Sequence, residues 1–320
     1  MFRLLPFRSP MGASLRQAPR RLHSGCSGGS EAQSSRAEAL KAHQAARMAR
    51  GLPRRQGLPG VRHIITVASG KGGVGKSTVS TNLAAALHHH SGLRVGLLDA
   101  DVFGPSIPRM VNSEGMEALV DESNKLIPVQ NYGLQTMSMG YLVGPDSAVV
   151  WRGLMVMKAM EQLTKQVAWK DLDVLIVDTP PGTGDTHLSL FQTLPISGAI
   201  IVSTPQHIAL GDVRKGIDMF KKVNVPIVGL VQNMSLHQCT RCGHVDHIFG
   251  CDGVRDLSDE YGIRLLADLP INAAICDGAD HGKPIVLSQA SSPAAMAFHS
   301  VADAVADHLR RMDEAAAVDA

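Results

Sequence analysis

The chain has 320 residues, of which 44% are hydrophobic and 19% are charged, so it can bury a sizeable core and is not disordered throughout. Lysine and arginine number 31 against 29 aspartate and glutamate, a balance that argues against a nucleic-acid-binding body. The most apolar window, residues 186–211, is interrupted by Pro195 and Pro205. We therefore expect neither a nucleic-acid partner nor a transmembrane span.

The N-terminal residues differ in composition from the rest. Residues 1–30 contain five arginines and many serines, but no aspartate or glutamate. An Arg-rich, Ser-rich and acid-poor start is typical of an organelle transit peptide, which we place at residues 1–37. A solvated basic tail, or one that binds RNA, is the alternative. Residues 38–61 are expected to form a short basic helix followed by a linker rich in proline and glycine.

Residues 62–312 alternate between short apolar runs and helical patterns. The runs lie near residues 64–68, 94–98, 174–177, 199–202 and 227–231, and the helices near 77–90, 154–167, 208–223 and 253–262. Nearly continuous apolar strands are typical of a parallel sheet covered on both faces, so the order predicts a doubly wound, mostly parallel α/β domain.

Three further segments complete this organisation. Residues 111–150 are expected to form an insertion that contains a hairpin. An apolar stripe that includes Phe298 and Val301 predicts a C-terminal helix over 294–312 that packs against the sheet. An acidic tail is expected over 313–320.

The most specific motif follows the first apolar run. Residues 69–78 satisfy the pattern G-x-x-x-x-G-K-[ST] between a predicted strand and a predicted helix, as a phosphate-binding P-loop requires. Lys76 is expected to reach the β- and γ-phosphates, and the Ser77 hydroxyl to hold Mg²⁺. The residues that we expect around the phosphates are Gly70, Lys71, Gly72, Gly73, Val74, Gly75, Lys76, Ser77 and Thr78.

Carboxylates stand at the ends of two predicted strands. Asp99 and Asp101 follow the second apolar run, and Asp178 follows the third. A carboxylate at the carboxyl end of a buried strand beside a phosphate loop can hold Mg²⁺ through water. Asp178 matches this role, Asp101 matches the residue that positions the attacking water, and Asp99 is expected to support them. An isolated aspartate at such a place is often a helix N-cap, the alternative that applies to Asp185.

A pair of cysteines, Cys239 and Cys242, forms a C-x-x-C segment followed by glycine. Two thiolates at this spacing can bind one metal, and three interpretations remain open. These are half of a shared iron–sulfur site, a zinc site completed by His244 or His247, and a redox dithiol. The chain lacks the thioredoxin-like context of a redox dithiol, and four zinc ligands within nine residues would be crowded. Cys251 and Cys276 are expected to be buried or inert.

Several of these segments together resemble one known family. The second lysine of the P-loop, Lys71, and the segments 99–108, 150–153, 178–185 and 232–234 resemble the Mrp/Nbp family of iron–sulfur scaffold ATPases, over roughly residues 60–290. That family has a deviant Walker A loop, as do MinD and the nitrogenase iron protein. One departure is Leu154, where many bacterial relatives have proline.

The resemblance implies a P-loop NTPase homodimer that binds ATP and Mg²⁺. In it, Lys71 crosses to the nucleotide of the partner subunit and Asn233 lies on the adenine edge. Cys239 and Cys242 from each subunit together hold one [4Fe–4S] cluster. The residues implied in slow ATP hydrolysis are Lys71, Lys76, Asp101 and Asp178, while the main role is cluster transfer.

With the transit-like start, the resemblance implies the mitochondrial branch of the family. This implies location in the matrix and iron–sulfur apoprotein clients, with subunits of respiratory complex I as the destination. A MinD-like switch without a cluster is the alternative, but it calls for a basic amphipathic tail and no C-x-x-C. A reductase like the nitrogenase iron protein is another, but its ligand cysteines occur singly.

Overall fold

The computed structural model describes residues 55–143, 153–182 and 184–318. The chain divides into two units, residues 1–52 and 53–320, and all described residues belong to the second. The expected transit peptide at 1–37, the basic helix that follows it and Val150–Arg152 lie outside the described residues.

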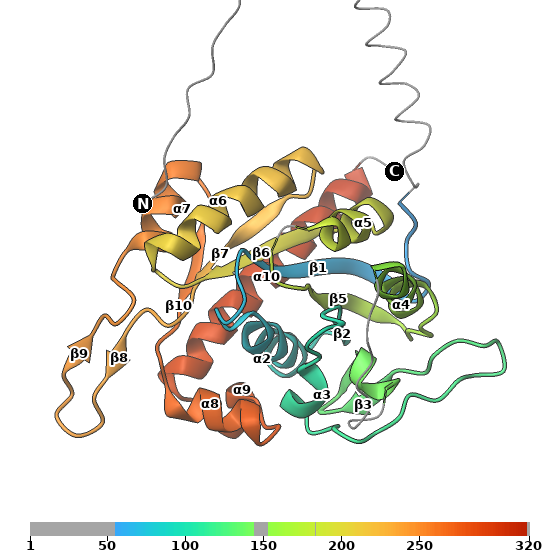
Figure 1. The fold of residues 1–320 in the computed structure, drawn as a ribbon, viewed down its shortest axis with the longest axis horizontal. Helices are drawn as coiled ribbons and strands as arrows, with labels where there is room; N and C mark the ends of the chain where they lie inside the picture. Colours follow the sequence, from blue (N-terminus) through green and yellow to red (C-terminus); the bar gives the residue numbers. More distant parts are fainter. Residues whose placement is uncertain (1–54, 144–152, 183, 319–320) are drawn as a thin grey trace, which may run out of the picture. The chain divides into compact units, whose positions relative to one another are not determined.

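An eight-stranded sheet forms the centre of this unit (Figure 1). Its strand order is β10-β7-β6-β1-β5-β2-β4-β3, and every neighbouring pair is parallel except β3 with β4. The predicted doubly wound, mostly parallel α/β fold is thus confirmed. The strands are β1 (Val61–Ser69), β2 (Val95–Asp99), β3 (Val129–Asn131), β4 (Leu134–Met137), β5 (Leu172–Asp178), β6 (Gly198–Ser203), β7 (Ile227–Gln232) and β10 (Leu265–Asp268).

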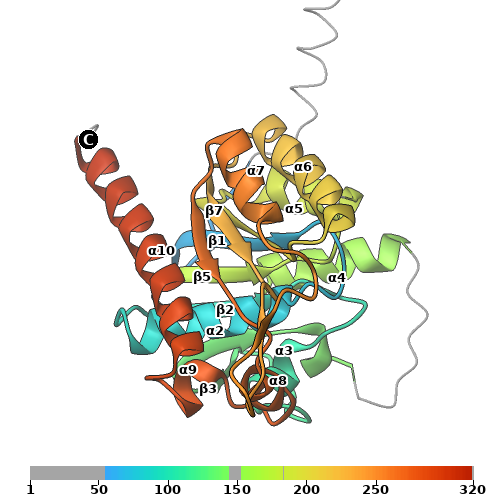
Figure 2. The same ribbon diagram turned by 90° about the vertical axis from the view of Figure 1, so that its left-hand side faces the viewer.

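Helices cover both faces of the sheet (Figure 2). Alternate residues of a strand point to opposite faces. In β1, Ile65 and Val67 therefore join the core cluster of one helical layer, whereas Ile64 and Ala68 join that of the other. The first layer contains α2 (Lys76–His89), α9 (Ile285–Ser288) and α10 (Pro293–Val318), and the second contains α4 (Gly153–Lys165), α5 (Asp185–Thr193), α6 (His207–Lys222) and α7 (Gly253–Tyr261).

The remaining short elements lie in the connections between strands. These are α3 (Ile107–Met110), the 3₁₀ helix η1 (Met139–Tyr141), the separate two-stranded sheet of β8 (His237–Gln238) with β9 (Val245–Asp246), and α8 (Ala273–Asp280). Within the described stretches, no helix is both long and apolar enough to span a membrane.

The hairpin that was predicted within residues 111–150 is present. Strands β3 and β4 are antiparallel, and Tyr132 and Gly133 between them both have positive φ, 50° and 74°. A two-residue turn of this kind matches the twist of the strands that it joins. Strand β4 pairs in parallel with β2, which makes the hairpin the edge of the main sheet.

Besides the short elements in the connections, the strand β10 and the end of α10 differ from the sequence expectation. Strand β10 was not predicted, because it has four residues and no β-branched one, and it pairs only with β7 at the other edge. Helix α10 continues past Met312 to Val318, so the residues expected as the start of an acidic tail are helical. The carboxylate of Asp313 meets Arg62 and His63 of β1, at 3.1 and 2.9 Å, which ties this end of the helix to the sheet.

The packing of α10 on the sheet leads to a stability prediction. Phe298 is 1% exposed and belongs to the core shared by α2, α10 and the sheet, whereas Met296 on the same helix is 53% exposed. Replacing a buried Phe by Ala leaves a cavity, so Phe298→Ala should lower the free energy of unfolding by about 3–5 kcal/mol in a urea titration. Met296→Ala is the matched control and should change it by less than about 0.5 kcal/mol. Equal losses would contradict the described packing.

Candidate functional site

The predicted P-loop lies between the carboxyl end of β1 and the start of α2. Gly75 has φ 84°, and a Cβ there would collide with the amide nitrogen of Asn233. A Cβ at Gly70 would lie 2.7 Å from the backbone of Asp212 in α6. The loop is therefore curled tightly between two neighbouring segments, and its backbone leads into the N-terminus of α2. This is the geometry in which N–H groups can surround a phosphate.

Asp178 is the centre of the hydrogen-bond network beneath the loop. Its carboxylate is fully buried at the end of β5. Its Oδ1 accepts a hydrogen bond from Ser80 at 2.6 Å and lies 2.8 Å from Lys76 Nζ, and its Oδ2 accepts one from Ser77 at 2.6 Å. The Ser77 hydroxyl and the Asp178 carboxylate are the hard oxygen donors that Mg²⁺ prefers, so the residues present fit this ion. Ser80 was missed by the sequence analysis, although it lies one helical turn after Lys76.

Asp99 anchors the loop that carries Asp101. Its carboxylate accepts hydrogen bonds from the backbone N–H groups of Asp101, Ser106 and Ile107 at 3.1–3.2 Å. Burial, and then the neighbouring charge of Asp178, raise the pKa of Asp99 to about 7. Through these hydrogen bonds Asp99 supports the loop that carries Asp101, as expected from the sequence. Asp101 is half-buried and accepts a hydrogen bond from Gly104, and burial raises its pKa.

Two other predicted residues contact the loop or lie beside it. Asn233, at the end of β7, donates from Nδ2 to the carbonyl of Val74 at 2.8 Å and is buried. Lys71 lies 3.7 Å from the Asp212 carboxylate, which is also 2.9 Å from Lys215. The P-loop, the strand-end carboxylates and Asn233 therefore meet at one edge of the sheet. The ion pair of Lys71 is with Asp212 of its own chain.

The cysteine pair lies on a knuckle between β8 and β9. The N–H of Cys239 donates to His244 at 2.8 Å, and the N–H of Gly243 donates to Cys239 at 2.9 Å. The backbone N–H groups of Cys242 and Arg241, and the Cys242 thiol, lower the pKa of Cys239. The knuckle therefore favours the thiolate form of Cys239, which is the form that binds metal.

The two histidines weighed as zinc ligands make other contacts. The Nε2 of His244 lies 3.1 Å from Asp246, and the Nδ1 of His247 lies 3.1 Å from the carbonyl oxygen of Ser235. Among the described residues, no group of three or more His, Cys, Asp or Glu side chains is arranged to hold a metal ion. Within the described residues, the knuckle therefore brings two cysteines close together in sequence but does not form a complete metal site.

The other two cysteines of the folded unit are exposed rather than buried, which corrects one of the two expectations for them. Cys276 lines a cleft of about 840 Å³ that also contains Cys239 and lies between the knuckle and the start of α8. Sequence spacing does not predict this, because 37 residues and several elements separate the two positions.

A buried histidine follows the loop that begins at Asp178. His187, in α5, is 1% exposed, and its ring centroid lies 5.7 Å from that of Phe191. Burial, and then the charge of Lys76, lower the pKa of His187 to about 4. The imidazole is therefore neutral at physiological pH, beside the residues that are expected to hold phosphate.

Comparisons with known proteins place the chain in one family. A family model described as ParA: NUBPL iron-transfer P-loop NTPase matches residues 60–306. The chain is 52% identical to the iron-sulfur cluster transfer protein NUBPL of Mus musculus, with 87% of each chain covered. It is 49% identical to the iron-sulfur protein required for NADH dehydrogenase, mitochondrial, of Arabidopsis thaliana (80% and 82% covered), and 47% identical to the iron-sulfur cluster carrier protein of Escherichia coli (79% and 68%).

The chain also matches solved structures of nucleotide-binding proteins and ATPases. The nucleotide-binding protein of Archaeoglobus fulgidus in complex with ADP matches with a TM-score of 0.64 and 34% identity, over 74% of this chain and 91% of that one. The cell division ATPase MinD of Pyrococcus furiosus matches with a TM-score of 0.58 and 24% identity, over 77% and 98%, a likeness of fold.

The pKa of His187 predicts how stability depends on pH. Because the folded-state pKa of about 4 is below the ordinary value of 6.5, the unfolded chain takes up the proton first. The contribution of His187 is complete above pH 6.5 and is lost as the pH falls towards 4, by up to about 3 kcal/mol. The difference in unfolding free energy between wild type and His187→Gln, measured by urea titration at each pH, should shift by this amount. A difference that is independent of pH would contradict the burial of this ring.

Proposed function

The chain belongs to the family of NUBPL iron-transfer P-loop NTPases, and from this premise we propose that it carries an iron–sulfur cluster and transfers it to client apoproteins. The observation that carries the proposal is the knuckle, which presents Cys239 and Cys242 together with backbone groups that favour a thiolate. A MinD-like switch without a cluster would assign no function to this knuckle. The relatives named for cluster transfer and cluster carriage support the same choice.

We propose a [4Fe–4S] cluster as the cargo and a homodimer as its carrier. A cluster of this type is usually held by four thiolates, whereas the knuckle of one chain offers two. A two-fold axis through the cluster would bring the same knuckle from a second copy and supply the missing pair. The cargo would then stabilise the dimer by mass action, because it binds only the associated form tightly.

We assign the P-loop to ATP and Mg²⁺. Bound MgATP supplies a phosphoanhydride whose hydrolysis can drive a change between two states. Lys76 would contact the phosphates and Ser77 would contact the metal. Asp178 would hold these two side chains in place through its own contacts with them. Asp101 would orient the attacking water and Asn233 would contact the adenine edge. Catalysis by this set is expected to be slow and secondary to transfer.

Lys71 is the residue that we propose acts between subunits. Its contact with Asp212 is long, 3.7 Å, and both side chains are partly exposed, so it is worth little and is readily exchanged. A lysine held so weakly can turn to phosphate oxygens of a nucleotide in the partner subunit.

For location, we propose the mitochondrial matrix, with residues 1–37 as the presequence, 38–61 as a connection and the P-loop domain after it. The acid-free, Arg-rich start supports this. We propose complex I subunits as clients, since the Arabidopsis relative is named for NADH dehydrogenase.

The cluster proposal is tested by metal analysis of the anaerobically reconstituted protein. We expect about four iron atoms per dimer, and loss of both iron and dimer in Cys239→Ala and Cys242→Ala, because the proposed cluster takes its four thiolates from these two positions of each subunit. Cys251→Ala is the matched control, since it also removes an exposed cysteine, and it should retain both. Iron and zinc content together with sedimentation of the same samples provide the readout. Stoichiometric zinc without iron, or a cluster on the monomer, would overturn the proposal.

The roles of the two lysines are separated by nucleotide binding and hydrolysis. Lys76→Ala should weaken ATP binding about 10- to 150-fold, because a charge-assisted contact with phosphate is worth about 1.5–3 kcal/mol. Lys71→Ala should leave ATP affinity within about twofold and lower hydrolysis only where the protein is dimeric. Lys215→Ala, which removes a neighbouring exposed charge, is the control for both. Unchanged ATP affinity in Lys76→Ala would contradict the assignment.

A further inference from the structure

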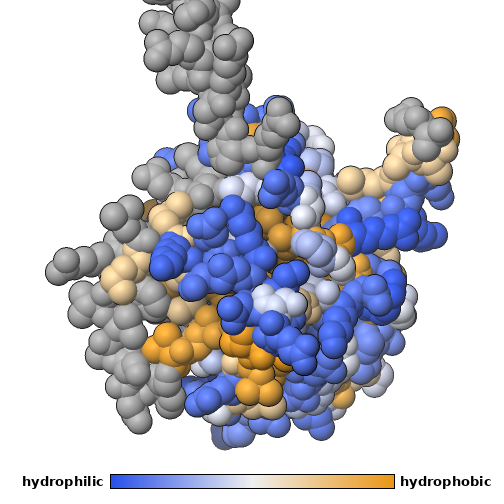
Figure 3. Space-filling view, turned by 90° about the vertical axis from the view of Figure 1, so that its right-hand side faces the viewer, coloured by the Kyte–Doolittle hydropathy of each residue, from blue (hydrophilic) through white to orange (hydrophobic). Residues whose placement is uncertain are grey.

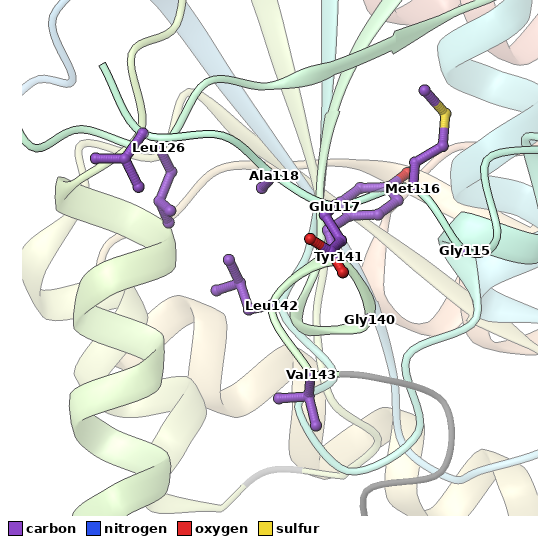
Figure 4. A pocket seen from close by; sticks show the side chains of 10 residues that line it. Gly115, Met116, Glu117, Ala118, Leu126, Gly140, Tyr141, Leu142 and Val143 are labelled. Atoms are coloured by element: carbon purple, nitrogen blue, oxygen red, sulfur yellow. The ribbon is translucent and has the colours of Figure 1, made fainter. Parts of the chain in front are cut away.

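A pocket with both apolar and polar walls lies in the insertion between α3 and α4, and it shares no residue with the P-loop or the knuckle (Figure 4). Its volume is about 310 Å³, near the lower limit of small ligand sites, which span roughly 300–1,000 Å³. Ala118 and Leu126 line it from one segment of the insertion, and Leu142 and Val143 line it from another. A pocket of this size suits one bulky apolar side chain better than a nucleotide.

The surface around the pocket is also apolar. Met116 is 48% exposed, Leu119 68% and Val120 55%, and all three belong to the segment that forms the pocket's wall or its continuation. Figure 3, which faces the side where the insertion lies, shows hydrophobic side chains gathered there among hydrophilic ones. Contiguous apolar surface rimmed by polar residues is typical of a protein-binding site.

The insertion that forms the pocket carries an excess of negative charge. Residues 111–143 contain four acidic side chains, Glu114, Glu117, Asp121 and Glu122, and one basic one, Lys125, although the whole chain has a net charge of +2. Asp121 accepts hydrogen bonds from the N–H groups of Ser123 and Lys125, so it stabilises the turn.

The three glutamates are different, because they are exposed and form no ion pair within the described residues. Glu117 itself lines the pocket.

We propose that this surface binds a partner polypeptide segment that presents a bulky apolar side chain flanked by lysine or arginine. The apolar side chain would fill the pocket between residues 118 and 143, and the flanking cations would meet the glutamates of the rim. Burial in the pocket provides most of the affinity, and the carboxylates provide orientation and the choice of a basic partner. The pocket shares no residue with the knuckle, and the experiment that tests it requires neither iron nor a dimer. A failure of this proposal can therefore be distinguished from a failure of the cluster proposal.

The pocket is connected to the nucleotide site by contiguous hydrogen bonds. Ser138 donates to Asp99 at 3.1 Å and accepts from the N–H of Gly140, which lines the pocket, at 3.1 Å. A Cβ at Gly140 would lie 2.9 Å from Pro108, in α3, which follows the loop that Asp99 anchors. A movement of that loop on nucleotide binding would therefore displace the pocket wall, so partner and nucleotide affinities are coupled reciprocally.

The test uses the full chain and a fluorescent peptide of about 18 residues, with leucine at helical spacing and lysine elsewhere. Its counterpart carries glutamate in place of lysine. Anisotropy titrations, with and without MgATP, should show saturable binding of the basic peptide alone and a dissociation constant that changes with nucleotide. Val120→Asp should weaken binding about tenfold, and Glu117→Gln about two- to fivefold with a weaker dependence on salt.

Matched controls exist on α10. Met296→Asp introduces the same charge at a side chain of similar exposure, 53%, and Glu314→Gln removes an exposed carboxylate. Both should bind the basic peptide as the wild type does. Equal binding of the acidic peptide, or equal loss in Val120→Asp and Met296→Asp, would overturn the site. A dissociation constant that is independent of nucleotide would overturn the coupling.

Discussion

The buried carboxylate of Asp178 is the interaction on which the nucleotide site depends. It lies at the end of a central strand, out of contact with water, and its charge is compensated by Lys76, Ser77 and Ser80. A buried charge that loses its partners is strongly destabilising, so these contacts hold the first turn of α2 against β5. Since the P-loop is the connection between β1 and α2, its curl is set by the same contacts.

A second carboxylate extends this organisation to the rest of the sheet edge. Asp99 pairs in register with Asp178 on the neighbouring strand, and burial, followed by the charge of Asp178, raises the pKa of Asp99. Its hydrogen bonds hold the loop that carries Asp101, and through Ser138 they reach the hairpin insertion. One pair of strand ends thus positions the nucleotide site and the wall of the proposed partner pocket.

The knuckle is built differently from the nucleotide site. The nucleotide site brings together residues from β1, α2, β2, β5 and β7 within one chain, whereas the knuckle is built by six consecutive residues and its own hydrogen bonds. It holds two free thiols, and within the described part of the chain they do not join a group of three or more side chains arranged to bind a metal ion. The nucleotide site is determined by the fold, whereas the knuckle is determined by a short segment, which the proposed dimer would pair with a second copy of itself.

The sequence by itself determined the P-loop, the five strands of the parallel core, the helices that cover them and the cysteine pair, because each depends on the spacing of neighbouring residues. Only the tertiary structure decided which distant residues meet. Ser80 on Asp178, Asn233 on the P-loop, Cys276 in the cleft of Cys239 and the burial of His187 all arise from elements far apart in the chain. The same holds for β10, which is a strand only because β7 lies beside it, and for the extension of α10, which Asp313 ties to β1. Periodicity reports which face of an element is buried, but not which partner covers it, and that is decided by long-range packing.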